Sequence, residues 1–520
     1  MRFFPPFLLA VILASMPGCE KNTDNANWII GLLLLGDSPR LDTDAPWPMW
    51  QHDPSHTGRS PYNGPVSAPS LADYEDLCCH GIFGSPVVDE DSNVYIGSIR
   101  SGEITTICAA FENPTVGASG LLHGLDSGGS PLAGFPYDSN RGSVMATAIE
   151  CAPLLLDDGS IVFGKDDGYM YRLRADGELI WESLADDPFD PLAPTDDNEQ
   201  MIPSPLPGSG STVYFLSHFA DVYGPGPVKD AVEAACPAID YFKDTATPWY
   251  SKLYSLNMSN GTRRWVFNPE DDTASWGQPM VGWGSPALGS DGSCIIGLMH
   301  TELPGDHYVP TKGRVFAIGP GGTRSWVFPA EGEFPIDYDY SIWASPVVSP
   351  SGNIYIGASD YTYDEGARLY SLTPGGIERW HYDFPENTIA ATPALLSDGT
   401  IIVATQNRHL TDENERFGAI YALEDQGDSA LLLWRYPETG TDVPSGFYSS
   451  PLVDGSDRVY IANEPFPSGT GTGLFLGLDS DGTLLFSIPL AGYVHGNLAL
   501  GPDGTLYVPL HRPARLLMYR

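Results

Sequence analysis

Two adjacent cysteines, Cys78 and Cys79, are the residues of this 520-residue chain whose spacing most directly suggests chemistry. Consecutive α-carbons lie about 3.8 Å apart, less than the usual span across a disulfide, so a bridge between them would be strained and seldom incidental. Because the chain has seven cysteines, these two thiols can also stay free or pair elsewhere. A vicinal disulfide and two separate thiols are both open at this point.

A third cysteine, Cys19, ends a segment that is typical of an export signal. Arg2 supplies a positive charge, residues 7–14 form an apolar stretch, and the small residue Gly18 directly precedes the cysteine. A small residue in that place resembles the bacterial lipobox, in which the cysteine is acylated. We therefore predict a signal peptide over residues 1–19 and lipidation at Cys19. The protein would then be exported to the bacterial cell envelope as an outer-membrane lipoprotein. A plain secretory signal is the alternative.

The formal net charge of −40, from 66 acidic and 26 basic residues, limits the partners of the protein. Such a surface repels nucleic-acid phosphates and anionic lipids, so we expect no nucleic acid and no membrane contact except through the N-terminal lipid. Many acids lie in Asp-Gly turns that lack the alternating oxygen ligands of a calcium loop, so we predict no metal site. The sequence also has no His-Glu-x-x-His motif and no phosphate-binding Gly-rich loop.

The strands that must position these residues are predicted from one sequence motif that is repeated along the chain. Each copy has a Ser-Pro-apolar-apolar strand, a Gly-containing turn, a second apolar strand, a Leu-Tyr-x-Leu strand and a Gly-x-x-x-Trp strand. The clearest copy comprises Ser345–Val348, Ser351–Asn353, Ile354–Gly357, Leu369–Leu372 and Gly376–Trp380. Four strand signals per unit, repeated every ~45–80 residues without a helical period, are typical of a β-propeller.

The repeat predicts an all-β fold, an eight-bladed β-propeller of four-stranded blades over residues 47–520. Seven copies begin with a proline and the eighth begins with Asn497–Leu500; the prolines are Pro86, Pro153, Pro205, Pro286, Pro346, Pro393 and Pro451. The last copy lacks a fourth strand, and Pro69–Tyr74 forms an unmatched strand signal. We therefore expect the N-terminal strand to complete the last blade and close the ring. The other segments are a tether over 20–46 and an insertion at about 217–251.

Two sets of residues in the repeat predict packing between blades. The residue before each proline is small, as close packing near the axis requires: Ser85, Ala152, Ser204, Ser285, Ser345, Thr392 and Ser450. Five tryptophans end the outer strands, where a large ring can wedge between adjacent blades: Trp181, Trp265, Trp326, Trp380 and Trp434.

The residues three positions before each proline begin the innermost strands, so they should surround one end of the axis. We call this set the mouth ring, and its members are Phe83, Glu150, Ile202, Trp283, Trp343, Ala390, Tyr448 and His495. Half of them are aromatic, against 11% of the chain, and exposed aromatics around a concavity suit a protein segment, a glycan or a flat ligand. We predict binding by Phe83, Glu150, Trp283, Trp343, Tyr448 and His495, with Glu150 and His495 orienting the ligand. Packing that fills the axis is the alternative.

The repeat and the phrase from Trp47 to Gly58 (WPMWQHDPSHTG) resemble the PQQ-like, or quinoprotein dehydrogenase-like, β-propeller superfamily. The resemblance covers about residues 47–520 and implies two different functions. One is that of the propeller lipoprotein of the outer-membrane β-barrel assembly machine, a scaffold with an N-terminal lipid signal. The other is that of quinone-dependent alcohol dehydrogenases, in which a vicinal disulfide packs on the cofactor and calcium is bound.

From these observations we predict a lipid-anchored, monomeric propeller that binds an envelope protein or a glycan, without catalysis and without a cofactor. The alternative is a dehydrogenase of alcohols or sugars that uses PQQ with calcium. The sequence offers no match to the calcium ligands or the catalytic aspartate of those enzymes, so the resemblance supplies no catalytic residue.

Overall fold

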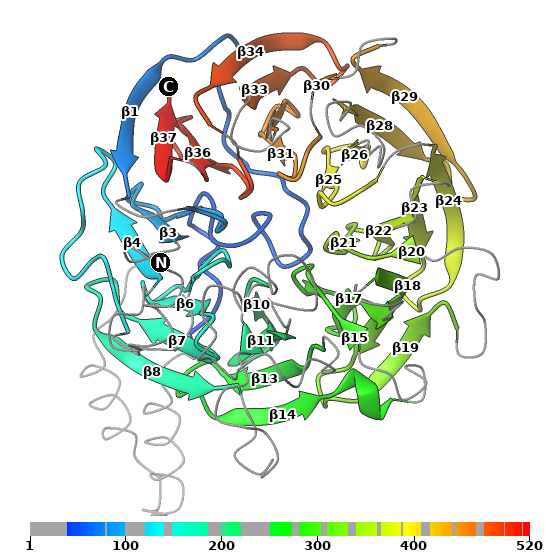
Figure 1. Cartoon of the computed structure of the whole chain (residues 1–520), viewed down its shortest axis with the longest axis horizontal. Helices are drawn as coiled ribbons and strands as arrows, with labels where there is room; N and C mark the ends of the chain where they lie inside the picture. Colours follow the sequence, from blue (N-terminus) through cyan, green and yellow to red (C-terminus); the bar gives the residue numbers. More distant parts are fainter. Residues whose placement is uncertain are drawn as a thin grey trace, which may run out of the picture. The chain divides into compact units, whose positions relative to one another are not determined.

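Eight units of antiparallel sheet surround a central axis in the computed structural model, as the repeat predicts (Figure 1). The structure describes residues 39–77, 81–98, 120–139, 148–185, 199–200, 203–219, 250–272, 280–302, 309–330, 340–360, 366–385, 388–406, 417–438, 443–444, 446–463, 473–492, 494–511 and 513–520. Within these ranges the elements are strands, apart from the 3-10 turn η3 (Pro269–Asp271). No helix there has the length and hydropathy needed to span a bilayer. The predicted all-β propeller is therefore confirmed.

The strands of each blade follow one another outward from the axis. Blade 1 contains β2 (Val87–Val88), β3 (Val94–Ser98) and β4 (Leu121–Leu125). Blade 2 contains β5 (Leu154–Leu155), β6 (Ile161–Gly164), β7 (Tyr169–Leu173) and β8 (Leu179–Leu184). Blade 3 contains β10 (Leu206–Pro207), β11 (Thr212–Leu216), β13 (Leu253–Asn257) and β14 (Arg263–Phe267). Blade 4 contains β16 (Ala287–Leu288), β17 (Cys294–Glu302), β18 (Val309–Ile318) and β19 (Arg324–Phe328).

The second half of the ring has the same order. Blade 5 contains β21 (Val347–Val348), β22 (Ile354–Asp360), β23 (Ala367–Leu372) and β24 (Glu378–Phe384). Blade 6 contains β25 (Ala394–Leu395), β26 (Ile401–Ala404), β28 (Ile420–Asp425) and β29 (Ala430–Tyr436). Blade 7 contains β31 (Leu452–Val453), β32 (Val459–Ala462), β33 (Gly473–Leu478) and β34 (Leu484–Leu490). Blade 8 contains β35 (Ala499–Leu500), β36 (Leu506–Leu510), β37 (Arg515–Tyr519) and β1 (Leu71–Asp76).

Blade 8 combines the last three strands of the chain with the N-terminal strand β1, as the unmatched strand signal predicted. Strand β1 pairs antiparallel with β37, from Leu71 opposite Tyr519 to Asp76 opposite Arg515. The strand begins two residues later than the sequence signal. In blade 1, single bridges to Pro131 and Tyr137 take the place of a fourth strand beside β4.

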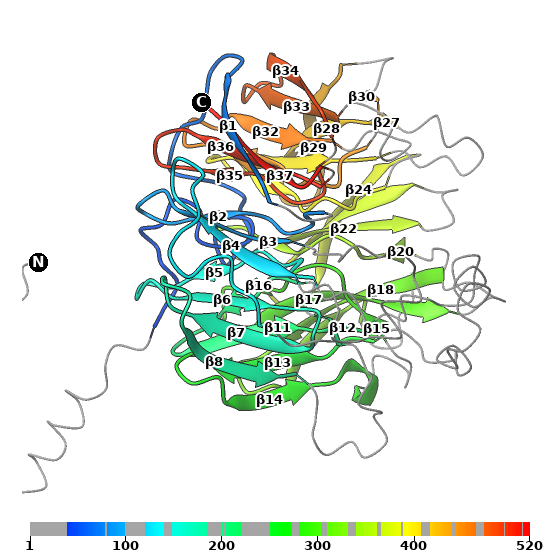
Figure 2. The same ribbon diagram turned by 60° about the vertical axis from the view of Figure 1, so that its left-hand side comes forward.

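Short additional strands extend several blades on one side of the ring, where Figure 2 shows β20, β27 and β30 projecting. They pair β15 (Met280–Val281) with β17, β20 (Tyr340–Ser341) with β22, β9 (Glu199–Gln200) with β12 (His218–Phe219), and β27 (Phe417–Gly418) with β30 (Val443–Pro444). Strands β15 and β20 lead directly into the mouth-ring residues Trp283 and Trp343, so this is the mouth side.

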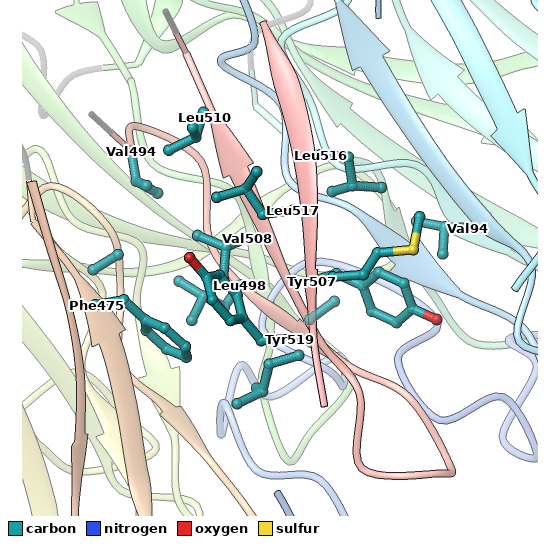
Figure 3. Packing of buried hydrophobic residues seen from close by; sticks show 14 of the residues in the cluster. Val94, Phe475, Val494, Leu498, Tyr507, Val508, Leu510, Leu516, Leu517 and Tyr519 are labelled. Atoms are coloured by element: carbon teal, nitrogen blue, oxygen red, sulfur yellow. The ribbon is translucent and has the colours of Figure 1, made fainter. Parts of the chain in front are cut away.

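Apolar side chains from neighbouring blades form the core between them. Figure 3 shows part of the cluster at blades 7, 8 and 1, where the rings of Phe475 and Tyr519 lie 5.2 Å apart. Val94 of blade 1 belongs to the same cluster as Tyr507 of blade 8. Burial of these surfaces is the main favourable term, and it couples each blade to the next.

The small residues before the prolines do more than permit close packing, because they form a ring of hydrogen bonds that we call the belt. In each bond the backbone N–H of one blade donates to the side-chain oxygen of a neighbour: Ala152 to Ser204 (2.9 Å), Ser204 to Ser285 (2.9 Å), Ser285 to Ser345 (2.8 Å), Ser345 to Thr392 (3.2 Å), Thr392 to Ser450 (3.0 Å), Ser450 to Asn497 (2.8 Å) and Asn497 to Ser85 (2.8 Å). Ala152 has no side-chain oxygen, so the belt is open between blades 1 and 2.

Four of the predicted tryptophans occupy one repeated site between blades. Trp326 donates its indole N–H to the carbonyl of Pro374 in the next blade, at 2.9 Å. Gly376 of that blade has φ +76°, and a Cβ there would lie 2.3 Å from the Trp326 ring. The same pairing joins Trp181 with Gly261, Trp265 with Gly322, and Trp434 with Gly482. Trp380 differs, because it donates to the Asp425 carboxylate at 2.9 Å.

The phrase from Trp47 onward is not part of a blade. Residues 47–60, which we call the plug, run across the centre of the ring (dark blue in Figure 1) and bond to successive inner strands. Its carbonyls accept from the N–H of the residue two after the repeat proline: Pro48 from Leu155, Pro54 from Leu288, Ser55 from Val348, Thr57 from Leu395 and Gly58 from Val453, at 2.7–2.9 Å. Trp47 exchanges two bonds with Val88 of blade 1.

Local hydrogen bonds hold the plug in its curved path. The Asp53 carboxylate accepts from the N–H groups of Ser55 and Thr57, at 2.9 and 3.3 Å. His56 is fully buried, and its Nδ1 lies 3.0 Å from the carbonyl oxygen of Pro346. Burial lowers the pKa of His56 to about 4, so the imidazole is neutral near pH 7.

Removing one belt oxygen should leave a buried N–H without its acceptor. We expect Ser345→Ala to lower the free energy of unfolding by about 1–3 kcal/mol, because the Ser285 N–H loses its partner. Urea unfolding followed by tryptophan fluorescence measures this. Ser345→Thr is the matched control, since a threonine already serves at position 392. Equal stability of the alanine and threonine variants would refute a stabilising role for the belt.

Candidate functional site

The mouth ring forms one end of the axis, opposite the plug. Each inner strand carries a mouth residue first, a belt residue two positions later and a plug contact three positions after that, as in Phe83, Ser85 and Val88. Every described member of the ring is partly exposed between two buried chain neighbours: Phe83, Glu150, Trp283, Trp343, Ala390, Tyr448 and His495. Ile202 lies outside the described residues. This alternation indicates that the side chains face away from the core and toward the axis.

Aromatic rings of blades 7, 8 and 1 form a continuous arc. The ring of His495 lies 5.1 Å from that of Tyr448 and 4.9 Å from that of Phe83. His511 packs against both Phe83, at 4.1 Å, and His495, at 5.6 Å. Burial, together with the nearby His511, lowers the pKa of His495 to about 3. His495 is therefore neutral near pH 7.

A second arc lies on blades 3, 4 and 5. Trp283 and Trp343 are stacked, with ring centroids 5.5 Å apart and planes inclined by 28°. The ring of His218 lies 4.0 Å from that of Trp283, and burial lowers the pKa of His218 to about 4. The Trp343 indole donates to the Ser341 hydroxyl at 2.9 Å, which fixes the orientation of that ring. Each arc combines residues of the mouth ring with one histidine outside the ring, His511 in the first arc and His218 in the second.

A second layer of polar residues lies beneath the mouth ring, and the sequence analysis missed it. These side chains follow the second strand of their blades and are at most 5% exposed: Asp166, His218, Gln406 and His511. They occupy equivalent places, two residues after Gly164, Leu216, Ala404 and Pro509. Aligning the second strands of the copies, as well as the prolines, would have revealed them.

Blade 2 differs from the others because it brings two carboxyl groups together. The N–H of Ala148 donates to Asp166 Oδ2 at 3.2 Å, and the N–H of Asp166 donates to the Ala148 carbonyl at 3.0 Å. Burial raises the pKa of Glu150 to about 7. Burial and the charge of Glu150 raise the pKa of Asp166 well above its ordinary value. The pair therefore holds a proton at pH values where isolated carboxyls are ionised.

The described residues show no cluster of side chains that could hold the calcium used by quinone enzymes. Calcium needs about six to eight oxygen ligands, and the described part of the chain has no group of three or more His, Cys, Asp or Glu side chains placed to hold a metal. Cys151 lies beside Glu150, but burial raises the pKa of its thiol to about 12, so it is not a ready nucleophile.

Several predicted features lie outside the described residues. They are the vicinal pair Cys78 and Cys79, the lipidation site Cys19, the signal peptide and most of the insertion at 217–251. These stay predictions. The two cysteines in the described ranges, Cys151 and Cys294, are buried and form no disulfide.

Comparison with known proteins supports the fold and adds no function. No family model matches the chain, and no curated protein matches it. Among solved structures, the Dos1 propeller has a TM-score of 0.52 at 11% identity, with 87% of this chain and 95% of that chain covered. The C-terminal WD40 domain of Sif2 has a TM-score of 0.48 at 11% identity, with 88% and 99% covered. At this identity the likeness shows a β-propeller, and the PQQ-like assignment stays a prediction.

The carboxyl pair should make stability depend on pH. The folded chain keeps a proton on Glu150 up to about pH 7, whereas the unfolded chain loses it near pH 4.5, so the free energy of unfolding falls as pH rises between these values. We expect Glu150→Gln to match the wild type at pH 5 and to exceed its stability at pH 8, as urea midpoints would show. Glu178→Gln, an exposed acid of the same blade, should have no such effect. Parallel pH profiles for Glu150→Gln and the wild type would contradict the assignment.

Proposed function

We propose that the protein is a non-catalytic binding module that holds a partner protein at its mouth ring. The observation that carries this proposal is the difference between the two ends of the axis. The plug bonds to the inner strands at one end, whereas the mouth-ring side chains at the other end are partly exposed. Interface centres are enriched in tryptophan and tyrosine, which bury a large area in few rotamers.

We propose further that a lipid on Cys19 anchors the propeller in a bacterial envelope, at the outer membrane. The support is the export signal and the small residue before Cys19. The chain contacts the ring before the predicted tether ends at residue 46, since the Arg40 carbonyl accepts from the Asp157 N–H of blade 2.

The stacked tryptophans should be needed for capture of a partner but contribute little to folding. We expect Trp283→Ala and Trp343→Ala each to reduce the yield of a cross-linked envelope partner by about tenfold or more, because truncated hot-spot residues cost at least 2 kcal/mol. Quantitative mass spectrometry measures the yield, and melting temperature reports the fold. Ile377→Ala, at a position 69% exposed on a turn of blade 5, is the control.

Three results would refute the proposal of a protein-binding module. Unchanged capture by both tryptophan variants would place the partner elsewhere. A glycan-array signal that depends on these tryptophans, without any protein partner, would make the ligand a glycan. Stoichiometric binding of PQQ in the presence of calcium, with dye-linked alcohol oxidation, would make the protein an enzyme.

The anchor is tested separately by fractionation. We expect the wild type to sediment with membranes after a high-salt wash and Cys19→Ser to appear in the soluble fraction, because one changed residue removes the acylation site. Sedimentation of Cys19→Ser with membranes to the same extent as the wild type would mean that another segment attaches the protein.

A further inference from the structure

We propose that the mouth ring recognises a basic side chain, lysine or arginine, on an exposed loop of the partner, and that Glu150 and Asp166 receive it. This inference rests on the proposed function and names the chemistry of the ligand. It concerns blade 2, where the mouth ring carries a carboxyl group in place of the aromatic residues of blades 1, 4, 5 and 7.

The two carboxyl groups lie on one face of the blade. Asp166 is bonded to Ala148 through the backbone and through Oδ2, and Ala148 precedes Glu150 by two residues, so their side chains point to the same side of the strand. The other oxygen, Asp166 Oδ1, is buried and has no hydrogen-bond partner in the described part of the chain. Buried acceptors are almost always paired, so an unpaired carboxylate oxygen behind a partly exposed Glu150 indicates a place for a donor from outside the chain.

Among the described residues, the charged groups near this pair leave the pKa of Asp166 well above its ordinary value. The charge of Lys165 acts on Asp166, but the Lys165 Nζ lies 3.5 Å from the Asp167 carboxylate and donates to the Ser139 hydroxyl at 2.6 Å. The other titratable neighbours within the described ranges are Asp167, whose charge repels the pair, and the thiol of Cys151. At neutral pH the proton is the cation that the pair holds, and a lysine or arginine can replace it.

The rest of the ring fits a peptide loop better than a free ion. Two carboxyl groups are too few for a dedicated metal site, whereas one ammonium or guanidinium group forms two or more hydrogen bonds with them. Trp283 and Trp343 offer a stacked pair for apolar side chains or for a second cation. The net charge of −40 attracts basic partners over long range.

The test uses peptides that differ only in charge. A hexapeptide with one central lysine is compared with its norleucine analogue, and one with a central arginine is compared with its citrulline analogue. Isothermal titration of the full-length protein at pH 8 should show at least tenfold tighter binding of each cationic peptide. At pH 5.5 this ratio should approach one, and at pH 7 binding should release a proton, measured in two buffers of different ionisation enthalpy.

Variants of the pair separate recognition from folding. Glu150→Gln and Asp166→Asn should each abolish the preference for the cationic peptide at pH 8, while circular dichroism stays that of the wild type. Glu178→Gln, in the same blade but at an exposed turn, should keep the preference. Equal affinity for charged and uncharged peptides, with partner capture still dependent on Trp283, would overturn this inference and leave the proposed function standing. Loss of dependence on both Trp283 and charge would overturn the two together.

Discussion

The belt of hydrogen bonds around the axis is the constraint on which the rest of the structure depends. Each bond joins the inner strand of one blade to that of a neighbour, so the bonds fix the height of every blade along the axis as well as its distance from it. A shift of one strand by one residue would break two bonds and exchange buried and exposed faces. The mouth ring lies two residues before the belt and the plug contacts lie three residues after it. The belt therefore fixes the positions of both along the axis.

Much of the fold was predictable from the sequence because its signals are local. A strand such as Ile354–Gly357 is recognised from its own residues and from the turns beside it, and the count of eight follows from repetition. The position of β1 was predictable because a missing strand and an unmatched strand leave one solution. The equivalent positions of Glu150 and Trp343 also followed from the repeat, which left binding and axial packing both open for them.

The features that were missed depend on contacts between distant residues. In the sequence, Ser85 is recognisable only as a small residue. The fold shows that its hydroxyl accepts a hydrogen bond from the backbone N–H of Asn497, 412 positions away. The plug has no alternating pattern, and its carbonyls bond to strands whose identity depends on the ring. Asp166 resembles any acid after a strand until Ala148 is seen to hold it beside Glu150. Sequence patterns give elements, whereas these sites arise from the way elements meet.

The path of the plug constrains the order in which the parts of the molecule can fold. Its residues meet blades 1, 2, 4, 5, 6 and 7 in chain order, and β1 then pairs with the last strand of all. During synthesis from the N-terminus, the plug is therefore made before the blades. Its contacts and those of β1 can be completed only after the last blades have formed. Closing a ring through contacts between residues so distant in sequence is slow, but it makes folding of the ring cooperative. Blade 3 is the exception in this series, because Pro207 lacks the backbone N–H through which the other six proline-led blades bond to the plug.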